Sequence, residues 1–402
     1  MTIASTILTV LARLLAMVGP FGVSVITARA LGPEDRGLYF LVVSYAQIAA
    51  QIGNVGLHSS NTYLVAAHPE RVRYILANTL IVSVILGPLA AWPTVWWFGS
   101  DIAPAAQSSI ALAFVLAPLI ILFLLVSNIA VAIGRVGLYN LLIIFSGTLA
   151  LGSAGVAAAL GADTTEFLWA AAAGFTISSV TGILALMPDC GWSLRPSFAL
   201  FRSGVTYSMR AYFATLAGFL MTRIGILILQ SRADMAVVGQ FSIAQQIAEG
   251  LGLLPSTVGL LLMPSLMRLP SRKDRAAETW RIGLKLAAAI TVFLVMLAAV
   301  IPVALPLVFG RDYAPAVPLV LAFLPSIFLL SIVIVVSQFL SSEGFPLAQV
   351  GIWIAATVLH TALSIALIPH FGAIAIPISF TISMLLILIG LSALAVQMTR
   401  KG

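Results

Sequence analysis

The sequence predicts an all-α polytopic membrane protein with twelve transmembrane helices, arranged as two pseudo-symmetric six-helix lobes around a central cavity. Three observations lead to this fold class: an apolar composition, a series of long apolar runs, and an internal repeat. Charged residues make up 8% of the 402 residues, and hydrophobic residues make up 61%. Soluble domains contain about 25% charged residues, so the lipid bilayer is the solvent that suits this chain.

Each apolar run is long enough to cross a membrane. A spanning helix needs about 20 residues to cross roughly 30 Å of hydrocarbon. The runs also lack the alternating polar pattern of a membrane β-barrel. We therefore expect one helix in each of the ranges 5–28, 38–62, 74–97, 105–133, 137–160, 166–187, 206–229, 237–263, 281–307, 315–341, 346–369 and 372–397.

Four segments of the first half recur, in the same order, in the second half. "FGSDIAPA" at Phe98–Ala105 is matched by "FGRDYAPA" at Phe309–Ala316, with six of eight residues identical. "FTIS" occurs at Phe175–Ser178 and again at Phe380–Ser383. Because each copy would contain six helices, both copies enter the membrane from the same side, as in parallel repeats related by an axis along the membrane normal.

The repeat divides the chain into two lobes and a linker. "PDCGWSLRPSFALFRSG" is the most polar long connection in the middle of the chain. We expect an amino-terminal lobe over residues 1–187, a cytoplasmic linker over 188–205 and a carboxyl-terminal lobe over 206–402. Two such bundles with a site between them are a known solution for alternating access, which makes transport the favoured function class.

The net charge of +7 reflects loop composition rather than a nucleic-acid partner. Cytoplasmic loops of membrane proteins are enriched in lysine and arginine. With the amino terminus inside, the inner connections and the carboxyl-terminal tail hold eleven basic residues and the outer loops hold four, so we expect both termini in the cytoplasm. The eleven are Arg71, Arg73, Arg135, Arg195, Arg202, Arg268, Arg272, Lys273, Arg275, Arg400 and Lys401, and the four are Arg29, Arg36, Arg232 and Arg311.

Polar side chains recur along the second apolar run at spacings of three and four residues. This spacing places them on one helix face, and that face must meet protein or a wet cavity because hydrocarbon offers no hydrogen bonds. Contacts between helices are one interpretation. The length of the column favours a cavity wall that binds substrate. The polar column consists of Ser44, Gln47, Gln51, Asn54, His58 and Asn61.

Glu249 is the only acidic residue within the predicted spans, away from their ends. A carboxylate at membrane depth is costly, and a functional role is the default hypothesis. Loss of water favours its protonated form, so we expect Glu249 to couple transport to an ion, H⁺ or Na⁺. A structural ion pair with a basic neighbour is the alternative.

Three arginines also lie within predicted spans, at Arg13, Arg210 and Arg223. Arg13 is about 12 Å along its helix, at 1.5 Å per residue. Arg210 is near the inner end of its span and could instead extend its side chain to the membrane surface. Arg210 and Arg223 are roughly 220° apart around a straight helix, so only one can face a given cavity. Guanidinium groups suit phosphate, and these residues are the predicted phosphate ligands.

Other chemistries lack their sequence signals. Cys190 is the only cysteine, which excludes a disulfide within the chain and a cysteine cluster for zinc. The sequence contains no Gly-x-x-x-x-Gly-Lys-Ser/Thr, Gly-x-Ser-x-Gly or His-Glu-x-x-His motif. We therefore expect a transporter rather than an enzyme, with no cofactor, driven by an ion gradient, the membrane potential or a downhill substrate.

Two motifs resemble a known family. "ITARALGPEDRGLYFLV" at Ile26–Val42 resembles the end of the first helix and the start of the second in Wzx-type polysaccharide flippases. "IGRVGLYN" at Ile133–Asn140 is similar to the stretch between helices four and five of that family. These proteins translocate O-antigen and capsule repeat units and belong to the multidrug/oligosaccharidyl-lipid/polysaccharide exporter superfamily.

The resemblance implies a flippase of the bacterial cytoplasmic (inner) membrane that works by alternating access. Its cargo would be an oligosaccharide linked to polyprenyl pyrophosphate, destined for cell-surface polysaccharide such as lipopolysaccharide O-antigen. Membrane lipids would surround it, and polysaccharide polymerase machinery would be a partner. The resemblance implies a cationic cavity, to which Arg13 and either Arg210 or Arg223 would contribute the positive charge. It also implies antiport driven by an ion gradient, in which Glu249 would bind the coupling ion. The loop at Gly32–Gly37 is interpreted as a structural turn.

Two alternatives stay open. The first is a cation-coupled multidrug or metabolite antiporter of the same superfamily, although such extruders usually carry membrane-embedded acids in the amino-terminal lobe, where this chain has none within its spans. The second is a membrane-embedded glycosyltransferase or polymerase, which the short outer loops disfavour.

Overall fold

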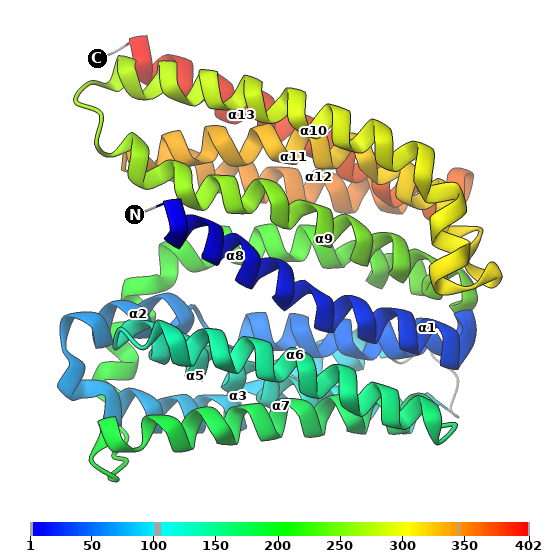
Figure 1. Ribbon diagram of the computed structural model, residues 1–402, viewed down its shortest axis with the longest axis horizontal. Helices are drawn as coiled ribbons and strands as arrows, with labels where there is room; N and C mark the ends of the chain where they lie inside the picture. The colour runs from blue at the N-terminus through cyan, green and yellow to red at the C-terminus, as the bar shows by residue number, and fades with distance from the viewer. Residues whose placement is uncertain (1–2, 100–105, 345, 401–402) are drawn as a thin grey trace. The chain divides into compact units, whose positions relative to one another are not determined.

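The computed structural model describes residues 3–99, 106–344 and 346–400, and nearly all of them are helical. The chain divides into two compact units, Met1–Phe219 and Leu220–Gly402. Each unit is a bundle of helices (Figure 1). The helix α8 is shared between the units, because the division falls inside it.

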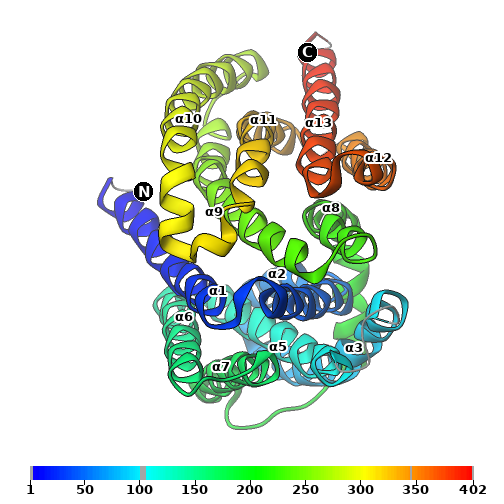
Figure 2. The same ribbon diagram turned by 90° about the vertical axis from the view of Figure 1, so that its right-hand side faces the viewer.

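The amino-terminal unit is built around α5. This helix packs against α1, α2, α3, α6 and α7, and Figure 2 shows these helices nearly end-on. The elements of the unit are α1 (Ile3–Gly53), α2 (Leu57–Ala67), η1 (Pro69–Arg71), α3 (Val72–Gly99), α4 (Gln107–Ala111), α5 (Ala113–Ala132), α6 (Val136–Ala159), α7 (Thr164–Leu186), η3 (Pro188–Cys190) and the first part of α8 (Phe198–Gln230).

The carboxyl-terminal unit is built around α11 in the same manner. This helix packs against α9, α10 and α13, and α12 packs on α13. Besides the end of α8, the unit contains α9 (Met235–Leu266), α10 (Arg272–Phe309), η4 (Arg311–Tyr313), α11 (Ala316–Ser342), α12 (Leu347–Phe371), η5 (Gly372–Ile374) and α13 (Ala375–Arg400).

The two units repeat one packing scheme. In the first unit α5 packs on α7 and α6 packs on α7; in the second, α11 packs on α13 and α12 packs on α13. The contact of α1 with α5 likewise has its counterpart in the contact of α9 with α11. The helical fold in two pseudo-symmetric lobes is therefore confirmed.

The predicted spans all lie on helices, although they are not all separate helices. Among the described residues, nine helices are long and apolar enough to cross a membrane, or up to ten if one bent pair counts as a single span. The first two predicted spans merge within α1, and α12 runs into α13 across η5. If α1 is divided at Gly32, and the merged helix Leu347–Arg400 at Gly372, the number of candidate spans rises from ten to twelve. Twelve spans are therefore compatible with the structure.

The turn between the first two predicted spans is a sharp break at Gly32. Its backbone angles are φ 73° and ψ 176°, a region that is accessible to glycine and strained for other residues. Pro33 follows and can begin the next helix, because the first helical residues need no amide hydrogen for the helix ladder. The interpretation of Gly32–Gly37 as a structural turn agrees with this geometry.

The second predicted span, 38–62, is not one continuous helix. The helix α1 ends at Gly53, α2 begins at Leu57, and their axes differ by 48°. Val55 and Gly56 between them have left-handed backbone angles, with φ of 42° and 79°. The prediction of a single polar helix face along this span is therefore wrong, because the face changes direction at the break.

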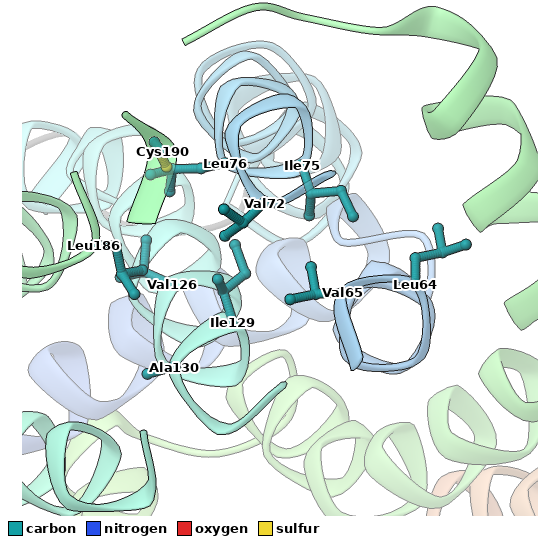
Figure 3. Packing of buried hydrophobic residues seen from close by; sticks show 10 residues of the cluster. All are labelled: Leu64, Val65, Val72, Ile75, Leu76, Val126, Ile129, Ala130, Leu186 and Cys190. Carbon is teal, nitrogen blue, oxygen red and sulfur yellow. The ribbon is translucent and has the colours of Figure 1, made fainter. Parts of the chain in front are cut away.

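A hydrophobic cluster fills one end of the amino-terminal unit (Figure 3). Side chains from α2, α3, α5, α7 and η3 meet there, and η3 contributes Cys190, which is 3% exposed. The cluster consists of Leu64, Val65, Val72, Ile75, Leu76, Val126, Ile129, Ala130, Leu186 and Cys190.

We predict that Cys190 resists alkylation in the folded protein. Burial, with a smaller contribution from the charge of Asp189, raises the pKa of the Cys190 thiol to about 11. The thiolate is the reactive form, so at pH 7.5 native labelling by a maleimide should be at least about a hundredfold slower than labelling in denaturant. The rate is measured by mass shift over time.

An exposed cysteine provides the control for this experiment. Trp192 is 69% exposed two residues further on, so Trp192→Cys in a Cys190→Ser background should label quickly in the native state. Equal native rates for Cys190 and for that control would contradict the buried, protonated thiol.

Candidate functional site

The carboxyl-terminal unit holds an ion pair between Arg223 on α8 and Glu249 on α9. The guanidinium Nη1 lies 2.8 Å from Oε1 of the carboxylate, and Nη2 donates to Oε2 at 3.0 Å. The second contact is a hydrogen bond and the first is a close ionic contact, so the guanidinium faces both carboxylate oxygens. The Arg223 side chain is 9% exposed and that of Glu249 is 34% exposed, so the carboxylate is the more accessible partner.

Gln245 holds the same carboxylate from one helical turn earlier. Its Nε2 donates to Glu249 Oε1 at 2.9 Å and to the carbonyl oxygen of Thr222 at 2.8 Å. Its Oε1 is buried and has no hydrogen-bond partner within the described residues. The sequence reasoning missed Gln245, although its spacing of four residues from Glu249 was the signal that could have found it.

A cavity of about 210 Å³ adjoins this group and lies entirely within the carboxyl-terminal unit. Pockets for drug-sized ligands are roughly 300–1,000 Å³, so this one suits water, an ion or a single chemical group. Its polar lining includes Glu249, Gln245, Ser256 and His360, and most of the remaining wall is apolar or aromatic.

His360 on α12 is a second titratable side chain at this cavity and is 1% exposed. Its Nδ1 lies 3.0 Å from Ser379 Oγ, and that oxygen lies 2.7 Å from Ser364 Oγ. The ring also packs edge-on against Phe380. The sequence analysis assigned no role to His360, and the described residues contain no group of three metal-binding side chains.

Within the predicted polar column, several members serve the fold. Asn54 sits at the break between α1 and α2, where its Nδ2 donates to the carbonyl oxygens of Ala50 and Gln51 at 3.1 and 2.9 Å. Its Oδ1 accepts the Gly56 amide at 2.9 Å and lies 3.1 Å from His58 Nδ1. Asn54 thereby bonds to backbone groups on both sides of the interrupted helix.

Other members bond within the amino-terminal unit. Ser44 Oγ donates to the Phe40 carbonyl at 2.8 Å. Asn61 Nδ2 donates to Thr79 Oγ1 on α3 at 3.4 Å. The Asn61 bond joins α2 to α3 and matches the alternative interpretation of the column as contacts that hold helices together, whereas the Ser44 bond stays within α1.

Gln47 and Gln51 differ from the rest of the column. The Oε1 of Gln47 and the Nε2 of Gln51 are buried and have no hydrogen-bond partner within the described residues. The two residues are one helical turn apart, so one acceptor and one donor are placed close together on α1. They are members of the column with buried polar atoms that have no partner within the described residues.

The motif arginine Arg36 is a structural residue. It is fully buried, and its Nη1 and Nη2 donate to Thr27 Oγ1 at 2.7 Å and Ser24 Oγ at 3.1 Å. Its guanidinium also lies against the rings of Tyr39 and Phe40. Its assignment to an outer loop is therefore corrected, and the outer loops then hold three basic residues rather than four.

The remaining predicted phosphate ligands are Arg13 on α1 and Arg210 on α8. Their side chains lie outside the described residues, so their roles stay predictions.

Comparison with protein families gives a match over most of the chain. The sequence profile of a family described as "Polysaccharide biosynthesis protein" matches residues 2–269. No curated protein sequence gives a significant match.

Solved structures with a similar fold are transporters and a flippase. An inward-facing multidrug resistance MATE family transporter of the MOP superfamily superposes with a TM-score of 0.79, 14% identity and 96% coverage of both chains. The lipid II flippase MurJ, in an inward closed conformation, superposes with a TM-score of 0.75 and 13% identity, covering 97% of this chain and 87% of the other. An outward-facing multidrug resistance MATE family transporter superposes with a TM-score of 0.67 and 15% identity, covering 96% of this chain and 94% of the other.

We predict that Arg223 and Glu249 stabilise the fold as a pair. Removing either partner leaves the other without its counter-charge, which costs about 3–5 kcal/mol in fully buried pairs. Because Glu249 is a third exposed, we expect a coupling of about 2 kcal/mol between Arg223→Gln and Glu249→Gln. Thermal unfolding of the four proteins in detergent measures this double-mutant cycle.

A second ion pair in the same unit is the matched control. Arg281 and Glu278 on α10 lie 2.6 Å apart, with 63% and 25% of their side chains exposed. Their cycle should show a coupling near zero. Couplings of the same size in the two cycles would contradict the energetic importance of Arg223–Glu249.

Proposed function

Because the chain belongs to the polysaccharide biosynthesis protein family, we propose that it is a flippase that moves a lipid-linked oligosaccharide across the bacterial cytoplasmic membrane by alternating access. The cargo is an oligosaccharide on polyprenyl pyrophosphate, supplied to cell-surface polysaccharide synthesis. The observation that carries the proposal is the close contact of the Arg223 guanidinium with both oxygens of a carboxylate. A guanidinium binds phosphate oxygens through the same planar fork.

In this proposal, cargo phosphate and Glu249 compete for Arg223. Without cargo, Glu249 holds the guanidinium by its two oxygens. Protonation of Glu249 removes its negative charge and frees Arg223 to bind a phosphate group. When the cargo leaves, Glu249 loses its proton and the pair forms again. The proton is therefore taken up and released together with the cargo phosphate, in contrast to the antiport that the resemblance implies.

The position of Arg223 favours H⁺ over Na⁺ as the coupling ion. Both oxygens of Glu249 lie within 3.0 Å of guanidinium nitrogens. A metal cation at the carboxylate would face that positive charge at short range, whereas a proton neutralises the carboxylate without occupying the same space.

The sugar is assigned to Gln47 and Gln51. Hydroxyl groups donate and accept hydrogen bonds, which matches the unpaired Oε1 and Nε2 of these two amides. His58, Asn54 and Asn61 support them by shaping α1 and α2. Arg13 and Arg210 are proposed as further phosphate contacts along the route.

The membrane setting completes the proposal. Both termini lie in the cytoplasm, on the side where the loop charges gather. The lipid tail of the cargo stays in the bilayer while the sugar crosses. A polysaccharide polymerase receives the repeat unit on the outer side.

A second candidate is a cation-coupled multidrug or metabolite antiporter. The mainly apolar and aromatic wall of the cavity, with Phe241, Phe323 and Phe380, favours a small organic cation. The neighbouring guanidinium of Arg223 disfavours one. The described residues offer no feature that favours a membrane-embedded glycosyltransferase or polymerase, and that function is not proposed.

Translocation in proteoliposomes tests the proposal. We expect the wild type to move a labelled undecaprenyl-pyrophosphate oligosaccharide, and Arg223→Gln to lose about tenfold or more of the rate, since one charge-assisted contact contributes about 1.5–3 kcal/mol. Glu249→Gln should retain cargo binding and lose its dependence on a pH gradient. Arg281→Gln, a surface arginine of the same unit, should behave as the wild type.

Parallel vesicles that contain an organic cation test the second candidate. Export of that cation against a proton gradient, with no movement of any lipid-linked saccharide, would replace the flippase by the antiporter. A sodium gradient that drives the saccharide where a proton gradient does not would refute H⁺ as the coupling ion.

A further inference from the structure

A second cavity in the carboxyl-terminal unit is an elongated groove lined by α10, α11 and α13, with a volume of about 320 Å³. The helix α11 forms its floor, and α10 and α13 form its walls; Figure 2 shows α11 between the other two. Lining residues on α10 run from Ala276 to Ala287, about 17 Å along the axis. Its walls are almost wholly apolar, including Leu284, Phe339 and Val396, so it fits an extended hydrocarbon chain.

The depth of the groove is set by the length of α10. Trp280 lines the groove and is 70% exposed. It precedes Phe309, at the end of the helix, by 29 residues, or about 44 Å, which matches the roughly 40–45 Å of a bilayer with its headgroup layers. Tryptophan is enriched at that interface. The groove therefore begins at the headgroup level and runs into the hydrocarbon.

Two cations without protein partners flank the open end. Arg272 Nη1 donates to the Met398 carbonyl at 2.8 Å, which brings the start of α10 beside the end of α13. Lys273 follows Arg272 directly and Arg400 lies two residues after Met398. Both are exposed, and neither has a hydrogen bond or ion pair within the described residues. Lys273 is also on the groove side of α10, seven residues or about two turns before Trp280.

Several other charges near the start of α10 are engaged by ion pairs or, for the carboxylate of Asp274, by the serine that caps the helix. Arg272 and Arg275 both bind Glu343, at 2.7 and 3.0 Å. Arg281 binds Glu278, and Asp274 accepts from Ser271 at the start of α10. Lys273 and Arg400 form no ion pair with a carboxylate of the described residues, so their charge is open to an anionic headgroup.

We propose that this groove binds an anionic phospholipid of the cytoplasmic leaflet, with one acyl chain along α11 and the phosphate between Lys273 and Arg400. An apolar groove that opens between two unpaired cations at headgroup level matches such a lipid in both shape and charge. The site is separate from the Arg223–Glu249 cavity, so it does not depend on the function proposed above.

Native mass spectrometry of the full-length protein tests the site, with phosphatidylglycerol or phosphatidylcholine of the same acyl chains as the probe. We expect phosphatidylglycerol to be retained about tenfold more tightly than phosphatidylcholine. The double variant Lys273→Gln/Arg400→Gln should lose this preference. Lys285→Gln is the matched control, because Lys285 is an exposed cation five residues after Trp280, on the other side of α10 from the groove; it should keep the preference.

A variant that fills the groove tests the acyl-chain contact separately. Ala395→Phe places a ring among the lining residues of α13 and should reduce retention of phosphatidylglycerol about tenfold without altering the thermal midpoint in detergent. Equal retention of the two phospholipids by the wild type, or loss of the preference in Lys285→Gln, would overturn the proposal. So would retention of undecaprenyl phosphate in preference to phosphatidylglycerol, which would assign the groove to the carrier lipid.

Discussion

Hydrocarbon offers no hydrogen bonds, and this constraint determines where each polar side chain of the protein lies. A buried polar group in a membrane helix must find a partner within the protein or face a wet cavity. For two residues of the amino-terminal unit the constraint is met locally: Arg36 binds Ser24 and Thr27, and Asn54 bonds to the backbone on both sides of a break. In the carboxyl-terminal unit it is met by Arg223, Glu249 and Gln245.

The two solutions have different functional consequences. Arg36 is fully buried and bonded to hydroxyl groups that cannot leave their helix, so it fixes the turn that joins two spans. Arg223 is instead bonded to a carboxylate that can be neutralised by a proton and that borders a cavity. Arg36 therefore fixes a turn, whereas the contact of Arg223 with Glu249 can be broken by a proton. For this reason we place the proposed coupling of transport to protons at Arg223 and Glu249.

Sequence patterns predicted the fold well, because hydrophobic length and the repeated "FGxDxAPA" loops directly report spans and halves. They predicted Glu249 as exceptional for the same reason, since one acid stands out in an apolar run. They could not show that Arg223 is its partner, because the two residues lie on different helices. Nor could they reveal the break at Asn54: the polar spacing continues unchanged through Val55 and Gly56, where the backbone turns left-handed. Polar spacing assigns residues to one helix face only if the helix is uninterrupted.

The most direct test of the account is binding of polyprenyl-pyrophosphate oligosaccharide to the detergent-solubilised protein as a function of pH. If Glu249 holds Arg223 until a proton or a phosphate displaces it, wild-type affinity rises as the pH falls, and Glu249→Gln binds about tenfold more tightly than the wild type at neutral pH, with little pH dependence. Equal affinities for the two proteins, with the same pH dependence, would show that the carboxylate does not compete with the cargo and would contradict the account.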